Sequence, residues 1–270
     1  MERPSWAPQG IDLSVPSVSR IYDYYLGGSH NFEVDREAAR RAIEIMPGLP
    51  KVMQANRAVM RRAVRYAVDS GITQFLDIGS GIPTFGNVHE VAQSAHPGAR
   101  VVYVDNDPVA VAHSRAVLEG NEDASIASAD LRDPKEILAS PEVSRLLDLN
   151  EPVALLLVAV LHFIPDEDDP WSAVAELRDA LAPGSLLVLT HAPTESGAMS
   201  TEQGGRVQGV YQQASSRLNL RSHEQVERFF DGFELVEPGV VFMPEWRPDL
   251  PVEQEDPAAF TGFAGVGRKA

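Results

Sequence analysis

Two acidic residues near the ends of strand-like apolar runs are the side chains whose chemistry is most readily inferred from this sequence. Asp77 lies near the end of a run that leads into Gly79 and Gly81, and Asp105 ends a second run. Alternate glycines after a strand allow a sharp turn and a close approach to a ligand, and they aim the N–H groups of the next helix at it. An acidic residue at the tip of the neighbouring strand accepts hydrogen bonds from both hydroxyls of a ribose. The two runs together predict a nucleoside-containing cofactor.

The glycine spacing distinguishes between two such cofactors. A dinucleotide-binding turn reads G-x-G-x-x-G, and Thr84 occupies its third glycine position, so an NAD-dependent oxidoreductase is the poorer match. The D/E-x-G-x-G loop of enzymes that use S-adenosylmethionine (SAM) fits better, with Asp77 two residues before Gly79, although Pro83 replaces the usual third glycine. SAM carries no phosphate, so a weaker anion-binding turn is sufficient. We therefore predict SAM as the cofactor.

The charge balance disfavours one class of substrate. The chain of 270 residues has 39 acidic and 23 basic side chains and a formal net charge of −16. Such a field repels polyphosphate, so we expect a small-molecule substrate rather than a nucleic acid.

Several other chemistries lack their residues. The chain has no cysteine, which excludes disulfides, thiolate nucleophiles and cysteine-based zinc sites. His89-Glu90 is followed by Gln93 where an H-E-x-x-H motif needs its second histidine, and we expect no metal site. The longest apolar run, 153–164, is too short to span a bilayer, and residues 1–10 lack the apolar core of a signal peptide. We therefore expect a cytoplasmic protein without a membrane partner.

The elements that must position these residues follow an alternating pattern. Strands are predicted at 73–78, 101–105, 124–128, 153–160 and 185–190, and helices at 86–95, 108–119, 134–147 and 168–182. Further helices are predicted near 202–217 and 222–230, and two last strands near 233–242 and 258–268. This order predicts an α/β fold of the class I methyltransferase type, a Rossmann-like, mostly parallel sheet with an antiparallel last strand and helices on both faces.

The chain reads as a single methyltransferase domain spanning residues 1–270. Residues 1–70 form an N-terminal arm and a helical cap, with helices predicted from Ser17 to Leu26, from Val34 to before Pro47 and from Pro50 to Val68. Residues 71–270 form the SAM-binding α/β core, which carries an insertion near 192–220.

Several segments resemble the signature of a bacterial family of SAM-dependent methyltransferases without an assigned substrate. They are residues 20–28, 31–32, 35–38, 56–57, 74–84, 87–90 and 102–108. The resemblance extends from about Ile11 to Arg268, and Pro83 is usual in that family. It implies a class I fold and SAM binding, and it adds Asn106 to the residues expected at the cofactor.

Asp130 and Leu131 follow the third predicted strand. In class I methyltransferases an acidic residue here bonds the adenine amino group, and the next backbone N–H, that of Leu131, meets the ring. The alternative is that residues 130–133 form a solvated turn that caps the helix starting near Pro134.

Two histidines follow the fourth and fifth strands. His162 is a candidate general base or a group that orients the substrate, since the pKa of a free histidine is near neutral. The alternative is a structural histidine bonded to a backbone carbonyl. His191 is a candidate of the same kind.

Two groups of residues on the predicted cap have competing interpretations. Tyr22 and Arg20 suit a lid over a sulfonium cofactor, because an aromatic face attracts a cation and an arginine binds a carboxylate; the alternative is ordinary helix packing. Arg57, Arg61 and Arg65 form an i,i+4 stripe that we interpret as a solvated, ion-paired face.

The sequence thus predicts a SAM-dependent methyltransferase that acts on a small organic molecule. One alternative is a SAM- or nucleoside-binding regulatory protein without turnover, which would share every cofactor residue. The other is the NAD-dependent oxidoreductase that Thr84 disfavours.

Overall fold

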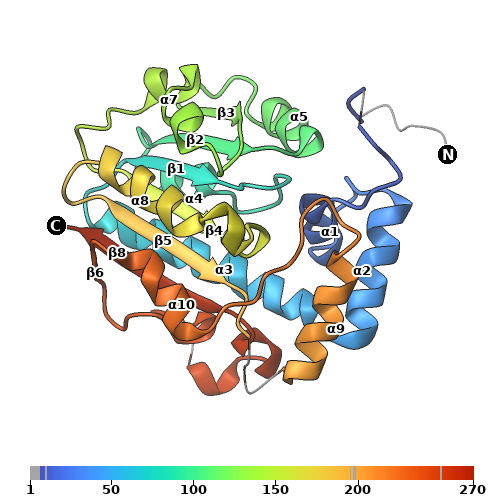
Figure 1. The fold of residues 1–270 in the computed structure, drawn as a ribbon. Helices are drawn as coiled ribbons and strands as arrows, with labels where there is room; N and C mark the ends of the chain where they lie inside the picture. The colour runs from blue at the N-terminus through green and yellow to red at the C-terminus, as the bar shows by residue number, and fades with distance from the viewer. Residues whose placement is uncertain (1–6, 10, 195, 197–198, 250) are drawn as a thin grey trace.

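The computed structural model describes residues 7–9, 11–194, 196, 199–249 and 251–270. Within these residues, eight strands form one sheet in the order β3-β2-β1-β4-β5-β8-β6, and β7 pairs with β8 (Figure 1). The strands are β1 (Gln74–Ile78), β2 (Arg100–Asp105), β3 (Ala124–Ser128), β4 (Ala154–Val158), β5 (Leu186–His191), β6 (Phe233–Leu235), β7 (Val241–Phe242) and β8 (Phe263–Lys269).

The helices of the N-terminal region are α1 (Val18–Tyr25), α2 (Glu33–Ile45) and α3 (Leu49–Asp69). Those between or after the strands are α4 (Val88–Ala95), α5 (Pro108–Val117), α6 (Pro134–Leu138), α7 (Pro141–Leu146), α8 (Pro170–Ala180), α9 (Thr201–Tyr211) and α10 (His223–Glu227).

The sheet has the predicted mixed topology. Strands β1 to β5 pair in parallel. Strand β8 lies between β5 and β6 and runs antiparallel to both, which confirms the expected antiparallel last strand.

Two predicted elements are divided in the structure, in both cases beside a proline. The strand expected at 233–242 consists of β6 and β7, separated by a segment that contains Pro238, a residue without the N–H that a strand needs. The helix expected at 134–147 consists of α6 and α7, because Pro141 disfavours the helical conformation at Ser140. The Ser140 side chain instead caps α7 by accepting from the Val143 N–H.

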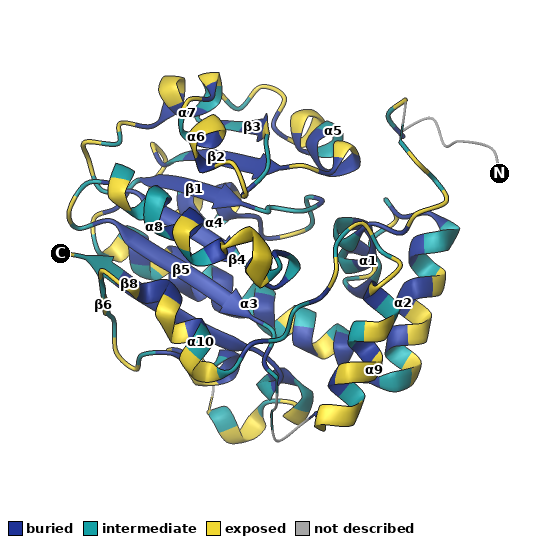
Figure 2. Cartoon of the chain, in the orientation of Figure 1, coloured by how far each residue is buried: buried dark blue, intermediate teal, exposed yellow. Residues whose placement is uncertain are grey.

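Helices cover both faces of the sheet, as the alternation of its side chains requires. Val101 and Tyr103 of β2 belong to the apolar cluster that contains α3 and α4. Val102 and Val104 belong to a second cluster with α6, α7 and α8 on the opposite face. Figure 2 shows the inner strands buried between these layers and the outer sides of the helices exposed.

The cap and the insertion meet at one side of the sheet. Helix α9 of the insertion lies beside α1 and α2, and α3 extends from the cap towards the sheet (Figure 1). The Tyr25 and Tyr211 hydroxyls, 3.2 Å apart, join α1 to α9. Among the described helices, none is long and apolar enough to cross a bilayer.

Candidate functional site

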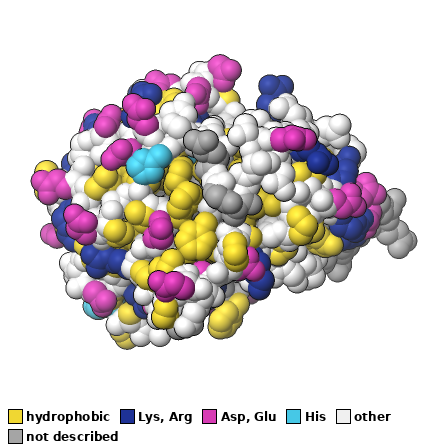
Figure 3. Space-filling model, turned by 90° about the horizontal axis from the view of Figure 1, so that it is seen from below, with side chains coloured by type: hydrophobic (Ala, Val, Ile, Leu, Met, Phe, Trp, Pro, Cys, Tyr) yellow, Lys and Arg dark blue, Asp and Glu magenta, His cyan; other side chains and the backbone are white. Residues whose placement is uncertain are grey.

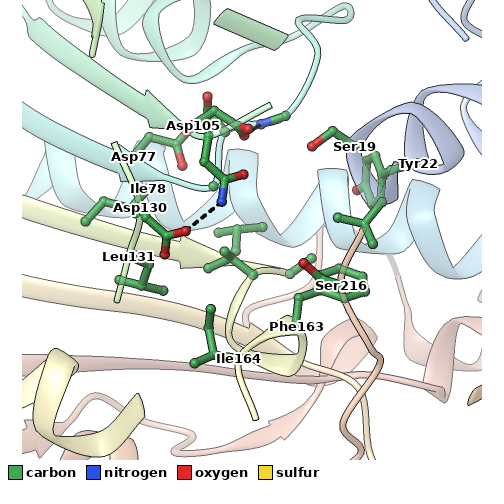
Figure 4. A pocket seen from close by; sticks show the side chains of 18 of the residues that line it. Ser19, Tyr22, Asp77, Ile78, Asp105, Asp130, Leu131, Phe163, Ile164 and Ser216 are labelled. Atoms are coloured by element: carbon green, nitrogen blue, oxygen red, sulfur yellow. Dashed lines mark hydrogen bonds between the residues drawn. The ribbon is translucent and has the colours of Figure 1, made fainter. Parts of the chain in front are cut away.

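A pocket at the carboxyl ends of β1, β2 and β4 collects most of the predicted site residues (Figure 4). Its lining includes every residue predicted to hold the cofactor except Arg20: Tyr22, Asp77, Gly79, Gly81, Asp105, Asn106, Asp130 and Leu131. The carboxyl groups of Asp77, Asp105 and Asp130 lie on the strand side, and Tyr22 belongs to α1 across the pocket (Figure 4).

Asp105 is held in place by the backbone around it. Its Oδ2 accepts from the Gly81 N–H at 2.7 Å and its Oδ1 accepts from the Asp107 N–H at 2.8 Å. Burial raises the pKa of Asp105 to about 6, against the opposing effect of these N–H donors. Each carboxylate oxygen keeps acceptor capacity, so Asp105 can receive two hydroxyl groups.

Asp77 is a buried carboxyl without a hydrogen bond from any described residue. It is 7% exposed. Burial raises its pKa to about 7; the charge of Arg57 lowers it and that of Asp105 raises it further. A buried charge without partners is costly. Its position in the pocket wall therefore indicates a ligand with a cationic or hydrogen-donating group.

Gly79 is required at the turn after β1 for two reasons. Its φ is +75°, and a Cβ there would lie 2.3 Å from Cγ2 of Val160. Its N–H donates to the Val104 carbonyl at 2.8 Å. The glycine thus lets the β1 turn close against β2 and the segment after β4, which shapes the pocket floor.

Both carboxylate oxygens of Asp130 accept hydrogen bonds within the protein. It accepts from the Arg132 backbone N–H, from the Arg132 guanidinium through two nitrogens, and from Asn106 Nδ2 at 2.9 Å (Figure 4). The side-chain hydrogen bond from Arg132 is the largest cause that lowers the pKa of Asp130 to about 2. These four donors use the acceptor sites of a carboxylate. The turn also caps the following helix, as the alternative interpretation predicts, and it does so through the side chain of Asp133.

Arg20 lies outside the pocket lining, contrary to its predicted place over the cofactor. Its side chain is 4% exposed, its Nε lies 2.9 Å from Asp35 Oδ2 and its Nη1 lies 3.7 Å from Asp107 Oδ2. Asp107 is also bonded by the Ser17 hydroxyl. These contacts draw the guanidinium towards two carboxylates and tie α1 to α2 and to the start of α5.

Arg57 is a pocket residue that sequence reasoning missed. The interpretation of a solvated, ion-paired face suits Arg65, which pairs with Asp249 at 2.9 Å, but it is wrong for Arg57, which lines the pocket. Arg57 donates to the Gly86 carbonyl at 3.0 Å, and its Nε is buried without a partner among the described residues. The available signal was the occurrence of residues 56–57 among the motifs shared with the resembled family.

A chain of hydrogen bonds holds an unusual backbone conformation after β4. Ala159 has φ +58°, a region that is costly for residues other than glycine. Its N–H donates to Thr190 Oγ1 at 2.9 Å, and the Thr190 hydroxyl donates to Asn56 Oδ1 at 2.6 Å. Asn56 Nδ2 in turn donates to the Tyr22 hydroxyl at 2.9 Å. The chain therefore connects the ends of β4 and β5 with α3 and α1.

A second pocket adjoins the first. The two share Val18, Tyr22, Asn56, Ala159 and Phe163 in their linings. The second pocket lies between the strand ends, the cap and the insertion that contains α9.

His162 lines this second pocket and not the first. Burial, with a smaller effect of Arg221, lowers its pKa to about 3. An imidazole that stays neutral to such low pH is a weak base, which argues against a role of His162 as general base. The ring accepts from the Ala192 N–H at 3.4 Å rather than donating to a backbone carbonyl.

His191 is a structural residue in this arrangement. Its Nε2 lies 2.9 Å from Arg221 Nη1 and its Nδ1 lies 2.8 Å from the Ala192 carbonyl, so both ring nitrogens are used. Among the described residues, no group of three or more His, Asp or Glu side chains is arranged to hold a metal ion.

The sheet order, the antiparallel β8 and the acidic residues at the tips of β1 and β2 define a class I SAM-dependent methyltransferase. The chain matches the model of the S-adenosyl methyltransferase family over residues 4–270 and belongs to that family. The family uses SAM, as the sequence predicts.

Two solved structures are similar over nearly the whole chain. One is a candidate methyltransferase from Thermobifida fusca, with 43% identity and a TM-score of 0.91, covering 98% of this chain and 99% of that one. Another is a DUF574 family protein from Streptomyces avermitilis, with 40% identity and a TM-score of 0.90, covering 96% and 99%.

A more distant structure agrees in fold alone. The mitomycin 7-O-methyltransferase MmcR has 17% identity and a TM-score of 0.50, covering 79% of this chain and 54% of that one. Among curated proteins, none matches this chain.

Proposed function

We propose that this methyltransferase holds SAM in the first pocket and transfers its methyl group to a small organic molecule in the second. One observation carries this proposal: the two pockets meet at a shared wall formed by Tyr22, Asn56 and Ala159. A cofactor in one pocket and an acceptor in the other would come into direct contact beside these shared residues, where the two pockets adjoin.

The residues of the first pocket fit the polar groups of SAM. Asp105 would accept from the ribose hydroxyls, because both of its oxygens are already oriented by backbone N–H groups. Asp77 would accept from the methionine ammonium, which would neutralise its buried charge. Arg57, with an unpartnered buried Nε, would hold the methionine carboxylate.

The adenine end would lie near Asn106, Asp130 and Leu131. Leu131 is buried and offers an apolar surface for the ring. Asp130 would accept from the adenine amino group in exchange for the bond from Asn106, whose side chain is exposed. Asn106 would then be released to face the ribose or solvent.

SAM, when bound, supplies a methyl group on a positively charged sulfur. The chain's own residues have to align the acceptor with that group and keep water out, which are the main needs of an in-line displacement. The hydrogen-bonded chain from Ala159 to Tyr22 fixes the wall at which alignment occurs. His162 would orient the acceptor as a neutral hydrogen-bonding group.

The distribution of charge supports a small acceptor. On the face seen in Figure 3, Lys and Arg side chains are interspersed with Asp and Glu and with apolar side chains. With a formal net charge of −16, such a surface suits a small molecule better than a polyphosphate. The expectation of a bacterial, cytoplasmic enzyme stays a prediction.

Calorimetry of the full chain tests the cofactor site. SAM should bind with a Kd in the micromolar range, on the order of −7 to −9 kcal/mol, and NAD should not bind. The Asp105→Ala variant should lose about 1.5–3 kcal/mol, roughly a 10- to 150-fold weaker affinity, which is the range for hydrogen bonds to a charged group. Glu119→Ala, an exposed carboxyl on the turn after α5, is the matched control and should bind as the parent does. Tighter binding of NAD than of SAM, or unchanged SAM affinity in Asp105→Ala, would refute the assignment.

A further inference from the structure

The second pocket has a distinctive chemical composition. None of the described residues that line it is an aspartate, glutamate, lysine or arginine. Four of the six methionines in the chain, Met46, Met53, Met199 and Met243, line it. Methionine side chains adapt to irregular shapes, and their sulfur atoms make favourable contacts with aromatic rings.

The two histidines in the lining do not add charge. Burial keeps the pKa of His162 at about 3 and that of His191 well below its ordinary value, so both rings are neutral at physiological pH. A charged ligand would therefore lose its hydration without gaining an ionic partner, which is strongly unfavourable. The pocket selects for an uncharged molecule.

Most polar groups in the lining already have partners within the protein. Asn56 and Thr190 belong to the hydrogen-bonded chain that ends at Tyr22, and the Tyr211 hydroxyl lies 3.2 Å from that of Tyr25. His191 uses both ring nitrogens. These groups shape the wall and have little capacity left for a ligand.

Two polar groups remain without a partner among the described residues. His162 Nδ1 accepts from the Ala192 N–H, which places the ring proton on Nε2 and leaves that N–H as a donor. The Thr261 hydroxyl is buried in a side chain that is 6% exposed and has no partner. A buried hydroxyl without a hydrogen bond is unfavourable, and both residues line the pocket. The two groups therefore favour a ligand with a polar atom.

Much of the wall of this pocket comes from the parts of the chain added to the common sheet. Tyr22 and Met53 belong to the cap, and Met199, Val207 and Tyr211 belong to the insertion. Tyr22, Phe163 and Tyr211 also contribute aromatic surface. The segment after β4 adds His162 and the end of β5 adds His191, so cap, insertion and strand ends together form this pocket.

We infer that the acceptor is an uncharged aromatic molecule with one hydroxyl group, which is bound by His162 Nε2–H and the Thr261 hydroxyl. Transfer would form the bond between the methyl group and that oxygen, break the S–CH3 bond to leave S-adenosylhomocysteine, and release the hydroxyl proton to solvent. This inference rests on the proposed function, because it assigns the acceptor to the second pocket. The apolar and methionine-rich wall binds the ring system, and the two polar groups fix its orientation at the wall shared with the cofactor.

Binding of a matched set of naphthalene probes to the full chain tests this chemistry. Calorimetry in the presence of saturating S-adenosylhomocysteine would compare 2-naphthol, naphthalene, 2-naphthoate and 2-naphthylmethylammonium. We expect 2-naphthol to bind most tightly and both charged probes to bind at least about tenfold more weakly, as the cost of burying an unpaired charge requires. Equal or tighter binding of either charged probe would overturn the inference.

Three variants locate the probe and identify its polar partners. Thr261→Val removes the hydroxyl at nearly constant shape and should weaken 2-naphthol about three- to tenfold while leaving naphthalene unchanged. Val207→Trp fills the pocket from α9 and should abolish binding of both neutral probes, whereas Arg206→Trp, exposed on the same helix, should not. Unchanged binding of 2-naphthol in both Thr261→Val and Val207→Trp would overturn the site.

SAM affinity, measured on the same variants, separates the two proposals. It should stay at the parental value in Thr261→Val and in Val207→Trp, which also shows that these variants are folded. Binding of 2-naphthol without any binding of SAM would refute the proposed cofactor site and leave the pocket assignment standing. Binding of SAM without binding of either neutral probe would refute the inference about the acceptor and leave the proposed cofactor site standing.

Discussion

The buried carboxyl of Asp77, which has no partner among the described residues, leads us to predict that its replacement raises the stability of the protein. Replacing Asp77 by Asn should stabilise the ligand-free protein at pH 8 relative to its parent, while weakening SAM binding. The physical reason is that the parent must bury an ionised carboxylate above the pKa of Asp77 and the variant does not. Ligand-binding sites often contain residues that lower the stability of the ligand-free protein, and Asp77 would be such a residue.

The magnitude follows from the pKa. The pKa of Asp77 rises from its ordinary 3.8 to about 7 in the folded protein. A group whose pKa is raised by folding contributes stability that is complete below pH 3.8 and is lost as the pH rises through 7. Between pH 5 and pH 8 the parent should therefore lose about 3 kcal/mol through this residue, since each pKa unit corresponds to about 1.4 kcal/mol. The Asp77→Asn variant has no carboxyl group at this position and should not show this pH-dependent loss of stability.

Thermal and urea unfolding of ligand-free protein at pH 5 and pH 8 measure the effect. For a chain of this length about 1 kcal/mol shifts Tm by roughly 2–4 °C, so the advantage of Asp77→Asn should grow by about 6–12 °C between the two pH values. Saturating SAM should reduce or reverse the advantage, because a ligand that binds the native state stabilises the parent more. An advantage that is absent at pH 8, or that is equal at pH 5 and pH 8, would refute the reasoning.

Two further predictions concern the wall between the pockets and the missed arginine. Thr190→Val should destabilise the protein by about 2–5 kcal/mol in urea unfolding, because it leaves the Ala159 N–H and Asn56 Oδ1 buried without partners. Thr190→Ser keeps the hydroxyl and should cost no more than about 1 kcal/mol for the lost methyl group; equal stability of the two variants would contradict the role of the hydroxyl. Arg57→Gln should weaken SAM roughly 10- to 150-fold in calorimetry through the lost charged hydrogen bond. Arg65→Gln on the same helix should leave SAM affinity unchanged. An equal loss of SAM affinity in both variants would show that Arg57 acts only through its charge and not through a direct hydrogen bond.

The sheet could be predicted from the sequence because its signals are local. Each inner strand is a short apolar run bounded by polar or glycine residues, and the expected strand at 124–128 coincides with β3. The loop that positions Asp77 and Asp105 was predictable for the same reason, since strand, turn and acidic residue lie within a few positions. Errors occur where a proline interrupts a pattern, as at Pro141 and Pro238.

The second pocket could not be predicted because its walls come from distant segments. Met53, Met199 and Thr261 look like ordinary apolar or loop residues in their local context, and only the packing of cap, insertion and last strands brings them together. The neutrality of His162 has the same origin. Its low pKa reflects burial and the charge of Arg221, which lies 59 positions along the chain.

Arg20 shows how a residue can serve a site without touching its ligand. Its place in the motif predicts a role at the cofactor, but helical position alone cannot reveal which partner its side chain meets. Asp35 and Asp107 give it two carboxylates inside the protein, and the Asp107 N–H donates to Asp105, the residue proposed to bind the ribose. Arg20 therefore connects the cap to the backbone that orients Asp105. If SAM occupies the first pocket as proposed, the cap would contact it through Tyr22 and would also support Asp105 from behind the pocket wall, through the start of α5.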